Sequence, residues 1–214
     1  GMQLELDRKE VWTRLTGEFN AYNLLAIYAT ACLLGEEKEQ VLLHLSALEA
    51  AEGRFFCIHG SRGVTAVVDY AHTPDALENV LRTIQKIRRP GQRILTLVGC
   101  GGNRDRTKRP EMAKIAFENS DLLILTSDNP RFEQPSAILE DMRKGLEGED
   151  EAAYLVMEDR REAIKCAVRL ARPGDILLVA GKGHEKYQEV NGVRHPFDDV
   201  AVVRQYLGNE TMVK

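Results

Sequence analysis

The chain has 214 residues, of which 43% are hydrophobic and 29% are charged, and its formal net charge is −4. These values are typical of a globular protein with a buried core, and the length suits one full domain plus a smaller unit. The mild acidity and the scattered basic residues argue against nucleic-acid binding, and no apolar run approaches the ~18 residues of a membrane-spanning helix. The four cysteines form no CxxC pair, so we expect reduced thiols, a cytoplasmic location and no zinc knuckle.

The first part of the chain is predicted to be mainly helical. Apolar residues at helical spacing predict a helix over Phe19–Leu34, and Gly35 is a suitable stop. A second, short helix is predicted over Glu39–Leu48, before Glu52-Gly53-Arg54 interrupts the pattern. We therefore expect residues 1–60 to form a unit of their own and residues 61–214 to form a second domain.

From Val64 onward, short apolar or β-branched runs alternate with segments of helical periodicity. The predicted strands are Val64–Asp69, Arg93–Val98, Leu122–Thr126, Tyr154–Met157 and Ile176–Ala180. The predicted helices are one that begins at Pro74 and those over Arg109–Asn119, Ser136–Leu146, Arg161–Ala171 and Asp198–Leu207. Asn191-Gly192 predicts a β-hairpin of Tyr187–Val190 with Val193–His195. This alternation indicates an α/β, Rossmann-like domain with a mostly parallel sheet covered by helices on both faces and a carboxyl-terminal hairpin.

Four polar loops follow predicted strands, where the ligands of parallel sheets bind. They are Asp69-Tyr70-Ala71-His72, Gly99-Cys100-Gly101-Gly102-Asn103-Arg104, Ser127-Asp128-Asn129-Pro130-Arg131 and Gly181-Lys182-Gly183-His184-Glu185. The planar fork of Arg131 suits a carboxylate, and Glu185 suits an ammonium group. Neither the dinucleotide pattern GxGxxG nor the P-loop pattern GxxxxGK[ST] is present, and no His, Cys, Asp or Glu spacing predicts a metal site.

Seven motifs in order give the chain a resemblance to a known family. They are GEFNAYNLLA, VVDYAHTPDALENVL, GCGGNRDRTKRPEMAKIA, SDNPRFEQP, DRREAI, VAGKGHEKYQ and FDD. With these motifs the chain, from Leu15 to Leu207, resembles the Mur ligases, ATP-dependent amide ligases of peptidoglycan synthesis. The resemblance implies that residues 1–60 are the end of a central ATP-binding domain. It implies that residues 61–214 are a carboxyl-terminal domain that binds the incoming amino acid.

The resemblance also assigns site residues, none of them catalytic. It implies nucleotide contacts, with Asn23 near the adenine and Asp69 at the ribose, for Asn20, Asn23, Arg54, Asp69 and His72. It implies an amino-acid pocket formed by Arg104, Asp128, Asn129, Arg131, Gly181 and Glu185.

The DNPR form of the third loop is associated with the branch of the family that adds meso-2,6-diaminopimelate to UDP-N-acetylmuramoyl-L-alanyl-D-glutamate. Physical chemistry agrees, because the second carboxylate of diaminopimelate can pair with Arg131 and Arg104, and a buried arginine without it would be uncompensated. The implied reaction uses ATP and Mg²⁺ to form an acyl phosphate, which the amino group of the amino acid then attacks. Without a P-loop the chain alone is expected to be inactive, and its oligomeric state stays open.

Other functions remain compatible with parts of the pattern. A related amide ligase of the lysine-adding, folylpolyglutamate or cyanophycin type would share the carboxyl-terminal fold, although DNPR together with GKGHE argues against it. A nicotinamide-dependent dehydrogenase would share the strand–helix rhythm but lacks its glycine fingerprint here. The third alternative is a binding module without catalysis.

Overall fold

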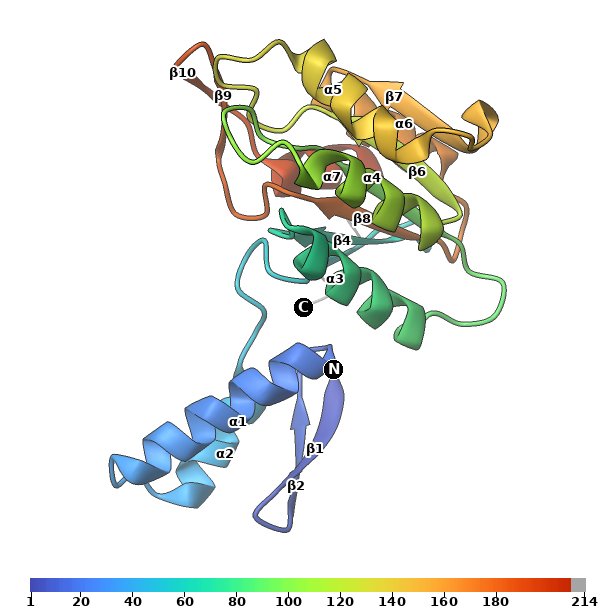
Figure 1. Cartoon of the computed structure of the whole chain (residues 1–214). Coiled ribbons are helices and arrows are strands. Elements are labelled where there is room, and N and C mark those ends of the chain that lie inside the picture. The colour runs from blue at the N-terminus through green and yellow to red at the C-terminus, as the bar shows by residue number, and fades with distance from the viewer. Residues whose placement is uncertain (209–214) are drawn as a thin grey trace. The chain divides into compact units, whose positions relative to one another are not determined.

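The computed structural model describes residues 1–208 and divides into two compact units, with the division between Ala51 and Glu52 (Figure 1). The boundary predicted from the sequence lay nine residues later, between residues 60 and 61. The difference arises from β3 (Phe56–His59), which the sequence analysis did not predict. This strand pairs antiparallel with β4 (Thr65–Asp69) and therefore belongs to the sheet of the second unit.

The first unit combines a β-hairpin with two helices. Its strands are β1 (Met2–Leu6) and β2 (Lys9–Thr13), and its helices are α1 (Glu18–Leu33) and α2 (Lys38–Ala47). The two helices of this unit were predicted from the sequence, but the hairpin was not. Its turn residues have positive φ, as a two-residue hairpin turn requires, but they are Asp and Arg rather than the usual Asn-Gly. The strongest local signal for a hairpin is therefore missing from this stretch.

Polar contacts to the helices hold this unusual turn. The Asp7 carboxylate accepts hydrogen bonds from the Lys38 ammonium at 2.6 Å and from the Tyr28 hydroxyl at 3.0 Å. These bonds hold the pKa of Asp7 below its usual range. The core of the unit lies between the hairpin and the helices and includes Leu24 and Leu45.

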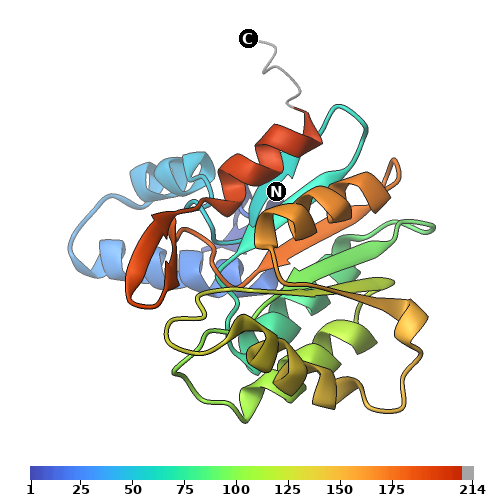
Figure 2. The same cartoon turned by 90° about the horizontal axis from the view of Figure 1, so that it is seen from above.

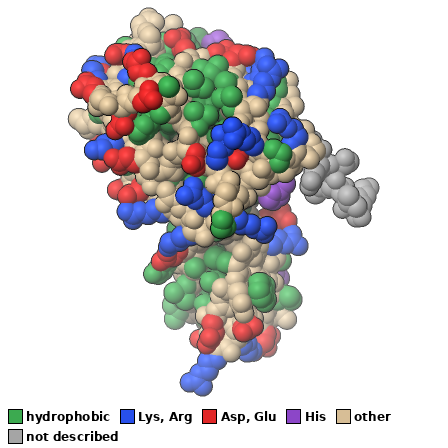
Figure 3. Space-filling view, turned by 90° about the vertical axis from the view of Figure 1, so that its right-hand side faces the viewer, with side chains coloured by type: hydrophobic (Ala, Val, Ile, Leu, Met, Phe, Trp, Pro, Cys, Tyr) green, Lys and Arg blue, Asp and Glu red, His purple; other side chains and the backbone are tan. Residues whose placement is uncertain are grey.

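Apolar side chains are also exposed on this unit, as Figure 3 shows for one face. The large exposed hydrophobic residues of the first unit are Trp12, Tyr22, Leu25, Ile27, Leu33, Leu34, Leu43 and Leu48. Helix α1 therefore carries apolar residues all round rather than on one stripe, a pattern usual for a helix that is covered on more than one side.

The second unit is built on a six-stranded sheet with strand order β3-β4-β8-β5-β6-β7. The strands not yet given are β5 (Ile94–Val98), β6 (Leu122–Thr126), β7 (Tyr154–Met157) and β8 (Ile176–Ala180). All neighbours after β4 pair in parallel, and every residue of β5 and β8 is buried. Continuous apolar sequence fits such central strands because both faces are covered.

Helices cover both faces of this sheet, as predicted (Figure 2). The helices are α3 (Pro74–Ile87), α4 (Lys108–Glu118), α5 (Pro135–Arg143), α6 (Arg160–Leu170) and α7 (Asp199–Leu207). Helices α3, α4 and α5 pack side by side on one face, and α6 packs with α7 on the other. Short 3₁₀ turns over Lys144–Leu146 and Glu151–Ala153 lead from α5 to β7. The predicted α/β class is confirmed.

The predicted carboxyl-terminal hairpin is present as β9 (Tyr187–Val190) and β10 (Val193–Pro196). Asn191 and Gly192 between the strands have φ values of 49° and 75°, which is the backbone that an Asn-Gly turn favours. Helix α7 begins directly after the hairpin, where the Asp198 carboxylate accepts a hydrogen bond from the amide of Val200. This cap fixes where the chain turns from the hairpin into the helix.

Candidate functional site

A cavity of about 590 Å³ opens where the loops after β4, β5, β6 and β8 meet. All four predicted loops contribute to it. Its lining residues are Tyr70, His72, Thr73, Gly101, Arg104, Asp105, Lys108, Asp128, Asn129, Arg131, Gly181, Glu185 and Tyr187. Seven of the eleven residues expected to form sites therefore line one cavity, and these seven include all six of the expected amino-acid pocket.

Glycines allow the loops to approach one another. A Cβ atom on Gly99 would lie 2.3 Å from the carbonyl oxygen of Thr126, so the chain after β6 can pass over the end of β5 only if residue 99 is glycine. A Cβ on Gly181, whose φ is 114°, would lie 3.2 Å from the Asp128 carboxylate. These two contacts bring Asp128 against the start of the loop after β8.

A third glycine yields a test of this close packing. A Cβ on Gly102 would lie 1.9 Å from the carbonyl oxygen of Pro130, a backbone atom that cannot move aside cheaply. We expect Gly102→Ala to destabilise the chain by roughly 2–3 kcal/mol. The control is Gly91→Ala, where no atom lies within 4 Å and only the positive φ of 84° is strained, at about 1 kcal/mol. Urea unfolding measures the stability of both variants. Equal losses of stability would contradict the proposed clash at Gly102.

Hairpin β9–β10 fastens the loop that carries Arg131. The Arg131 amide donates to the carbonyl of Glu189 at 2.9 Å, and the Asn191 amide donates to the carbonyl of Arg131 at 2.6 Å. The side-chain amide of Gln188 donates to the carbonyl of Asp128 at 2.7 Å. The Glu189 amide donates to the Asn129 side-chain oxygen at 2.9 Å. The hairpin therefore fixes the backbone of Asp128 and Arg131 and the side chain of Asn129.

Arg131 itself is held in an uncommon conformation. Its φ is 52°, in the left-handed region that non-glycine residues rarely adopt, and the two hairpin hydrogen bonds hold it there. Its guanidinium donates to the carbonyl oxygen of Gly102 at 2.8 Å and lies 3.9 Å from the Glu189 carboxylate. Arg104 and Lys108 add positive charge to the same cavity, and Arg104 makes no ion pair with any residue in 1–208.

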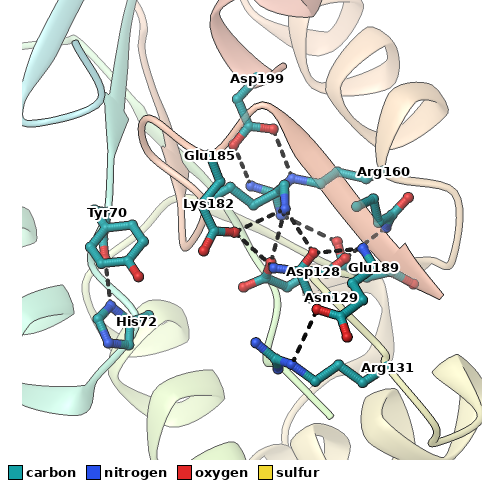
Figure 4. A network of polar contacts seen from close by, with 12 residues as sticks. Tyr70, His72, Asp128, Asn129, Arg131, Arg160, Lys182, Glu185, Glu189 and Asp199 are labelled. Atoms are coloured by element: carbon teal, nitrogen blue, oxygen red, sulfur yellow. Dashed lines mark hydrogen bonds and ion pairs between the residues drawn. The ribbon is translucent and has the colours of Figure 1, made fainter. Parts of the chain in front are cut away.

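The floor of the cavity is acidic but contains a buried lysine that the sequence analysis did not single out (Figure 4). The Lys182 side chain is fully buried. Its ammonium lies 3.1 Å from the Asn129 oxygen, 3.2 Å from Glu185 Oε2 and 3.5 Å from Asp128 Oδ1. The Asn129 amide also donates to Glu185 Oε2, at 2.7 Å. Burial raises the pKa of Asp128, while Lys182 and then Arg160 oppose that rise.

A fully buried ion pair lies beneath this floor. Arg160, the first residue of α6, binds the Asp199 carboxylate through Nε at 2.8 Å and Nη2 at 2.7 Å. The same guanidinium donates to the carbonyl of Ser127 at 3.3 Å and to that of Ala180 at 3.0 Å. These carbonyls directly precede Asp128 and Gly181. Arg160 therefore links the ends of β6 and β8, which are not neighbours in the sheet.

The expected nucleotide contacts of the second unit gather around the Tyr70 ring, beside the cavity. The Arg54 guanidinium lies 4.7 Å from the ring centroid, and the centroid of the His72 ring lies 4.5 Å from it. Asp69 is buried, and its carboxylate oxygens accept hydrogen bonds from the amides of Phe55 at 2.6 Å and Ala71 at 2.8 Å. Burial raises the pKa of Asp69. Asp69 thus fixes the backbone beside Arg54 and keeps unused lone pairs on both oxygens.

The other two expected nucleotide contacts, Asn20 and Asn23, lie on α1 of the first unit. The Asn20 side-chain amide donates to the carbonyl of Thr16 at 2.9 Å, and that of Asn23 lies 3.4 Å from the Asn20 oxygen. These bonds stabilise the start of the helix.

A second buried arginine supports the loop after β5 from the other side. Arg109 is fully buried, and its guanidinium binds the two Glu133 oxygens at 2.9 and 2.8 Å and Asp141 Oδ2 at 2.9 Å. Glu133 also accepts the amide of Asn103 at 2.5 Å. The hydrogen bonds from Arg109 and then from Asn103 lower the pKa of Glu133 from 4.5 to about 2.

This shift predicts an acid-dependent loss of stability. A carboxylate whose pKa is lowered on folding stabilises the native state above its unfolded pKa, and the stabilisation is lost as pH falls from 4.5 toward about 2. We expect Glu133→Gln to be less stable than the parent chain near pH 6, and the difference to shrink as the solution is acidified. Urea unfolding at a series of pH values measures it. If the stability difference between Glu133→Gln and the parent chain stays constant down to about pH 3, the ion pair of Glu133 with Arg109 is contradicted.

The described part of the chain contains neither a membrane-spanning helix nor a metal-binding cluster. No helix within residues 1–208 is long and apolar enough to cross a membrane. No group of three or more His, Cys, Asp or Glu side chains in these residues is arranged to hold a metal ion.

A family model described as Mur ligase, glutamate ligase domain, matches residues 53–183, more than half of the chain. The chain belongs to the Mur ligase family. The UDP-N-acetylmuramoyl-L-alanyl-D-glutamate--2,6-diaminopimelate ligase of Cytophaga hutchinsonii is 56% identical to it over 207 residues, 97% of this chain and 42% of the relative. The Phocaeicola vulgatus protein of that name is 52% identical over 210 residues, 98% of this chain and 43% of the relative. This Mur ligase chain thus spans less than half the length of these relatives.

Solved structures agree with the family assignment. A structure with the same ligase name superimposes with a TM-score of 0.70 at 42% identity, covering 96% of this chain and 42% of that one. A Thermotoga maritima folylpolyglutamate synthase superimposes with a TM-score of 0.62 at 19% identity, covering 81% of this chain and 38% of that one, which shows the shared fold alone. The resemblance to Mur ligases found in the sequence is confirmed.

Proposed function

We propose that this chain is the amino-acid-binding part of an ATP-dependent amide ligase that adds meso-2,6-diaminopimelate to UDP-N-acetylmuramoyl-L-alanyl-D-glutamate in peptidoglycan synthesis. The observation that carries the proposal is the charge pattern of the cavity. Its rim offers the guanidinium groups of Arg131 and Arg104, and its floor offers the carboxylates of Glu185 and Asp128. The names of relatives that are 56% and 52% identical over almost the whole chain point to the same activity.

One end of meso-diaminopimelate fits this pattern as a zwitterion. Its ammonium group would lie against Glu185, and its carboxylate would pair with the fork of Arg131, with Arg104 nearby. Asn129 and the backbone at Gly181 complete the pocket. Lysine has an ammonium group but no carboxylate at that end. A pocket built for a polar group rejects an analogue that lacks it, because its own buried polar groups are then left unpaired.

The nucleotide would bind beside this pocket. Arg54 and His72 lie against the Tyr70 ring, which follows Asp69 in the chain. In the first unit, Asn20 and Asn23 keep their proposed nucleotide roles, with Asn23 near the adenine. ATP with Mg²⁺ supplies the phosphoryl group that activates the dipeptide carboxylate. The role of this chain is to hold the amino group of the incoming amino acid in position for attack, which is a contribution of orientation. Such a ligase would act on a soluble nucleotide precursor in the cytoplasm.

The experiment that tests this function joins the chain to the amino-terminal part of the Cytophaga hutchinsonii ligase. Phosphate release with UDP-N-acetylmuramoyl-L-alanyl-D-glutamate and ATP is then measured with meso-diaminopimelate, lysine or glutamate as the amino acid. We expect turnover with meso-diaminopimelate alone. Preference for lysine would contradict the substrate assignment, and preference for glutamate would favour a folylpolyglutamate-type ligase.

A further inference from the structure

Lys182 stands out because it is a buried cation that none of the predicted roles uses. Its side chain is fully buried, although lysine is among the residues least often found inside proteins. The ammonium group has three N–H donors and three acceptors at 3.1–3.5 Å, on Asn129, Glu185 and Asp128. No donor is left for a ligand, so Lys182 acts on the pocket through its neighbours (Figure 4).

The contacts of Lys182 decide how Glu185 faces the cavity. Glu185 Oε2 accepts hydrogen bonds from both Lys182 and the Asn129 amide, at 3.2 and 2.7 Å. The other oxygen, Oε1, accepts no hydrogen bond from any residue in 1–208. Since Glu185 lines the cavity, this second oxygen is the one available to a ligand. Lys182 and Asn129 together therefore fix the rotation of the Glu185 carboxylate.

Lys182 also sets the charge of the floor. Asp128 and Glu185 carry two negative charges, and the ammonium between them leaves one. Two nearby ion pairs add no net charge. Arg160 pairs with Asp199 beneath the floor, and Arg131 lies near Glu189 of the hairpin. Tyr70 and Tyr187 also line the cavity, and the Lys182 ammonium lies 5.5 Å from the centroid of the Tyr187 ring. Arg104, Asp105 and Lys108 line the rim.

We propose that Lys182 is a positioning residue that turns the free oxygen of Glu185 toward the ammonium group of the amino acid and keeps the pocket floor at one net negative charge. The inference rests on the proposed function and extends it to the reason why the pocket takes one ammonium group. Without Lys182, two carboxylates would share the floor with no cation between them, and neighbouring carboxylates of this kind take up a proton between them. A floor that has taken up this proton would attract the ammonium group of the ligand less strongly.

The test compares the parent chain with Lys182→Met, which keeps the length of the side chain but removes its charge, and with Lys182→Arg, which keeps the charge. Lys114→Met on the exposed face of α4 is the matched control. Thermal unfolding first establishes that each variant is folded. Calorimetric titration with meso-diaminopimelate is then done between about pH 6 and pH 8.5, and ¹³C NMR of the Asp128 and Glu185 carboxyl groups follows proton uptake by this pair without ligand.

The parent chain and Lys114→Met should bind with an affinity that hardly changes over this range. Lys182→Met should bind at least about tenfold more weakly near pH 6 and recover as the pH rises, since coupled carboxylates titrate more than one pH unit apart. Its Asp128–Glu185 pair should take up a proton at higher pH than in the parent chain, and Lys182→Arg should restore much of the affinity. Unchanged affinity would overturn the inference, and so would a loss of affinity that is equal at every pH while proton uptake by the Asp128–Glu185 pair is unchanged.

The two proposals fail in different ways. If the parent chain does not bind meso-diaminopimelate, the proposed function fails, while the ligand-free titration of the Asp128–Glu185 pair still decides the role of Lys182. If the parent chain binds and Lys182→Met behaves like it, only the role of Lys182 fails. If Lys182→Met does not fold, Lys182→Gln, which keeps two N–H donors but no charge, takes its place. It should show the same shift in proton uptake and a smaller loss of affinity.

Discussion

Arg131→Ala is expected to weaken binding of meso-diaminopimelate by about 100-fold or more, because the variant leaves the distal carboxylate of the ligand without its bidentate partner in a partly desolvated pocket. Binding of lysine should change far less, since lysine has no carboxylate at that end. Arg131→Lys should recover only part of the loss, because a lysine ammonium cannot match the two oxygens of a carboxylate. The selectivity of the cavity for meso-diaminopimelate over lysine would therefore depend on the guanidinium group of Arg131.

Calorimetric titration of the parent chain and the two variants with both amino acids measures this effect. Arg89→Ala is the matched control, since Arg89 is exposed and lies in the turn after α3, away from the cavity. Its affinity should equal that of the parent chain. Equal weakening of meso-diaminopimelate and lysine by Arg131→Ala would contradict a role in reading the carboxylate.

Arg160→Ala is expected to lower the free energy of unfolding by about 3–5 kcal/mol, because it leaves the Asp199 carboxylate charged and fully buried without a partner. Asp199→Ala should have an effect of similar size for the converse reason. The double variant Arg160→Met/Asp199→Leu should be much closer to the parent chain, since replacing both ions by apolar groups of similar volume removes the unpaired charge. Arg160 also lies at the start of α6, where a cation opposes the helix dipole, so it contributes no local helix stability.

Urea unfolding with a common m-value measures these differences. The control is Lys165→Ala, which breaks the partly exposed pair with Glu162 on the same helix and should cost less than about 1 kcal/mol. A loss for Arg160→Ala no larger than that of the control would contradict the ion pair. A double variant as unstable as both single variants added together would show that the two residues act independently.

The regular elements of the second unit were largely readable from the sequence. Strands β6, β7 and β8 have the predicted bounds, because apolar or β-branched runs bounded by polar turns leave little ambiguity. The strands that were missed lie at edges. Strand β3 spans four residues and is only partly buried, and β1 and β2 are joined by Asp7-Arg8, which carries no glycine or asparagine signal. Their pairing depends on tertiary contacts that a local pattern does not contain.

Only the residues of the candidate site that lie in a family motif could be predicted from the sequence. The family motifs led to the residues of the cavity, but their spacing says nothing of what supports those residues. Lys182 lies between two predicted residues, yet lysine usually predicts an exposed side chain. Gln188 and Glu189 reach the third loop only because the hairpin folds back over it, and Arg160 and Asp199 meet from helices 39 residues apart. Such contacts arise from topology rather than from local sequence.

The most direct test of the central claim is an NMR titration of the chain with meso-diaminopimelate and, separately, with lysine, following the backbone amides of Asn129, Arg131 and Glu185. We expect meso-diaminopimelate to shift these amides along saturable curves, while lysine at the same concentrations leaves them nearly unchanged. Equal shifts with both amino acids, or shifts confined to residues outside the cavity, would contradict the assignment of this cavity to an amino acid with a distal carboxylate.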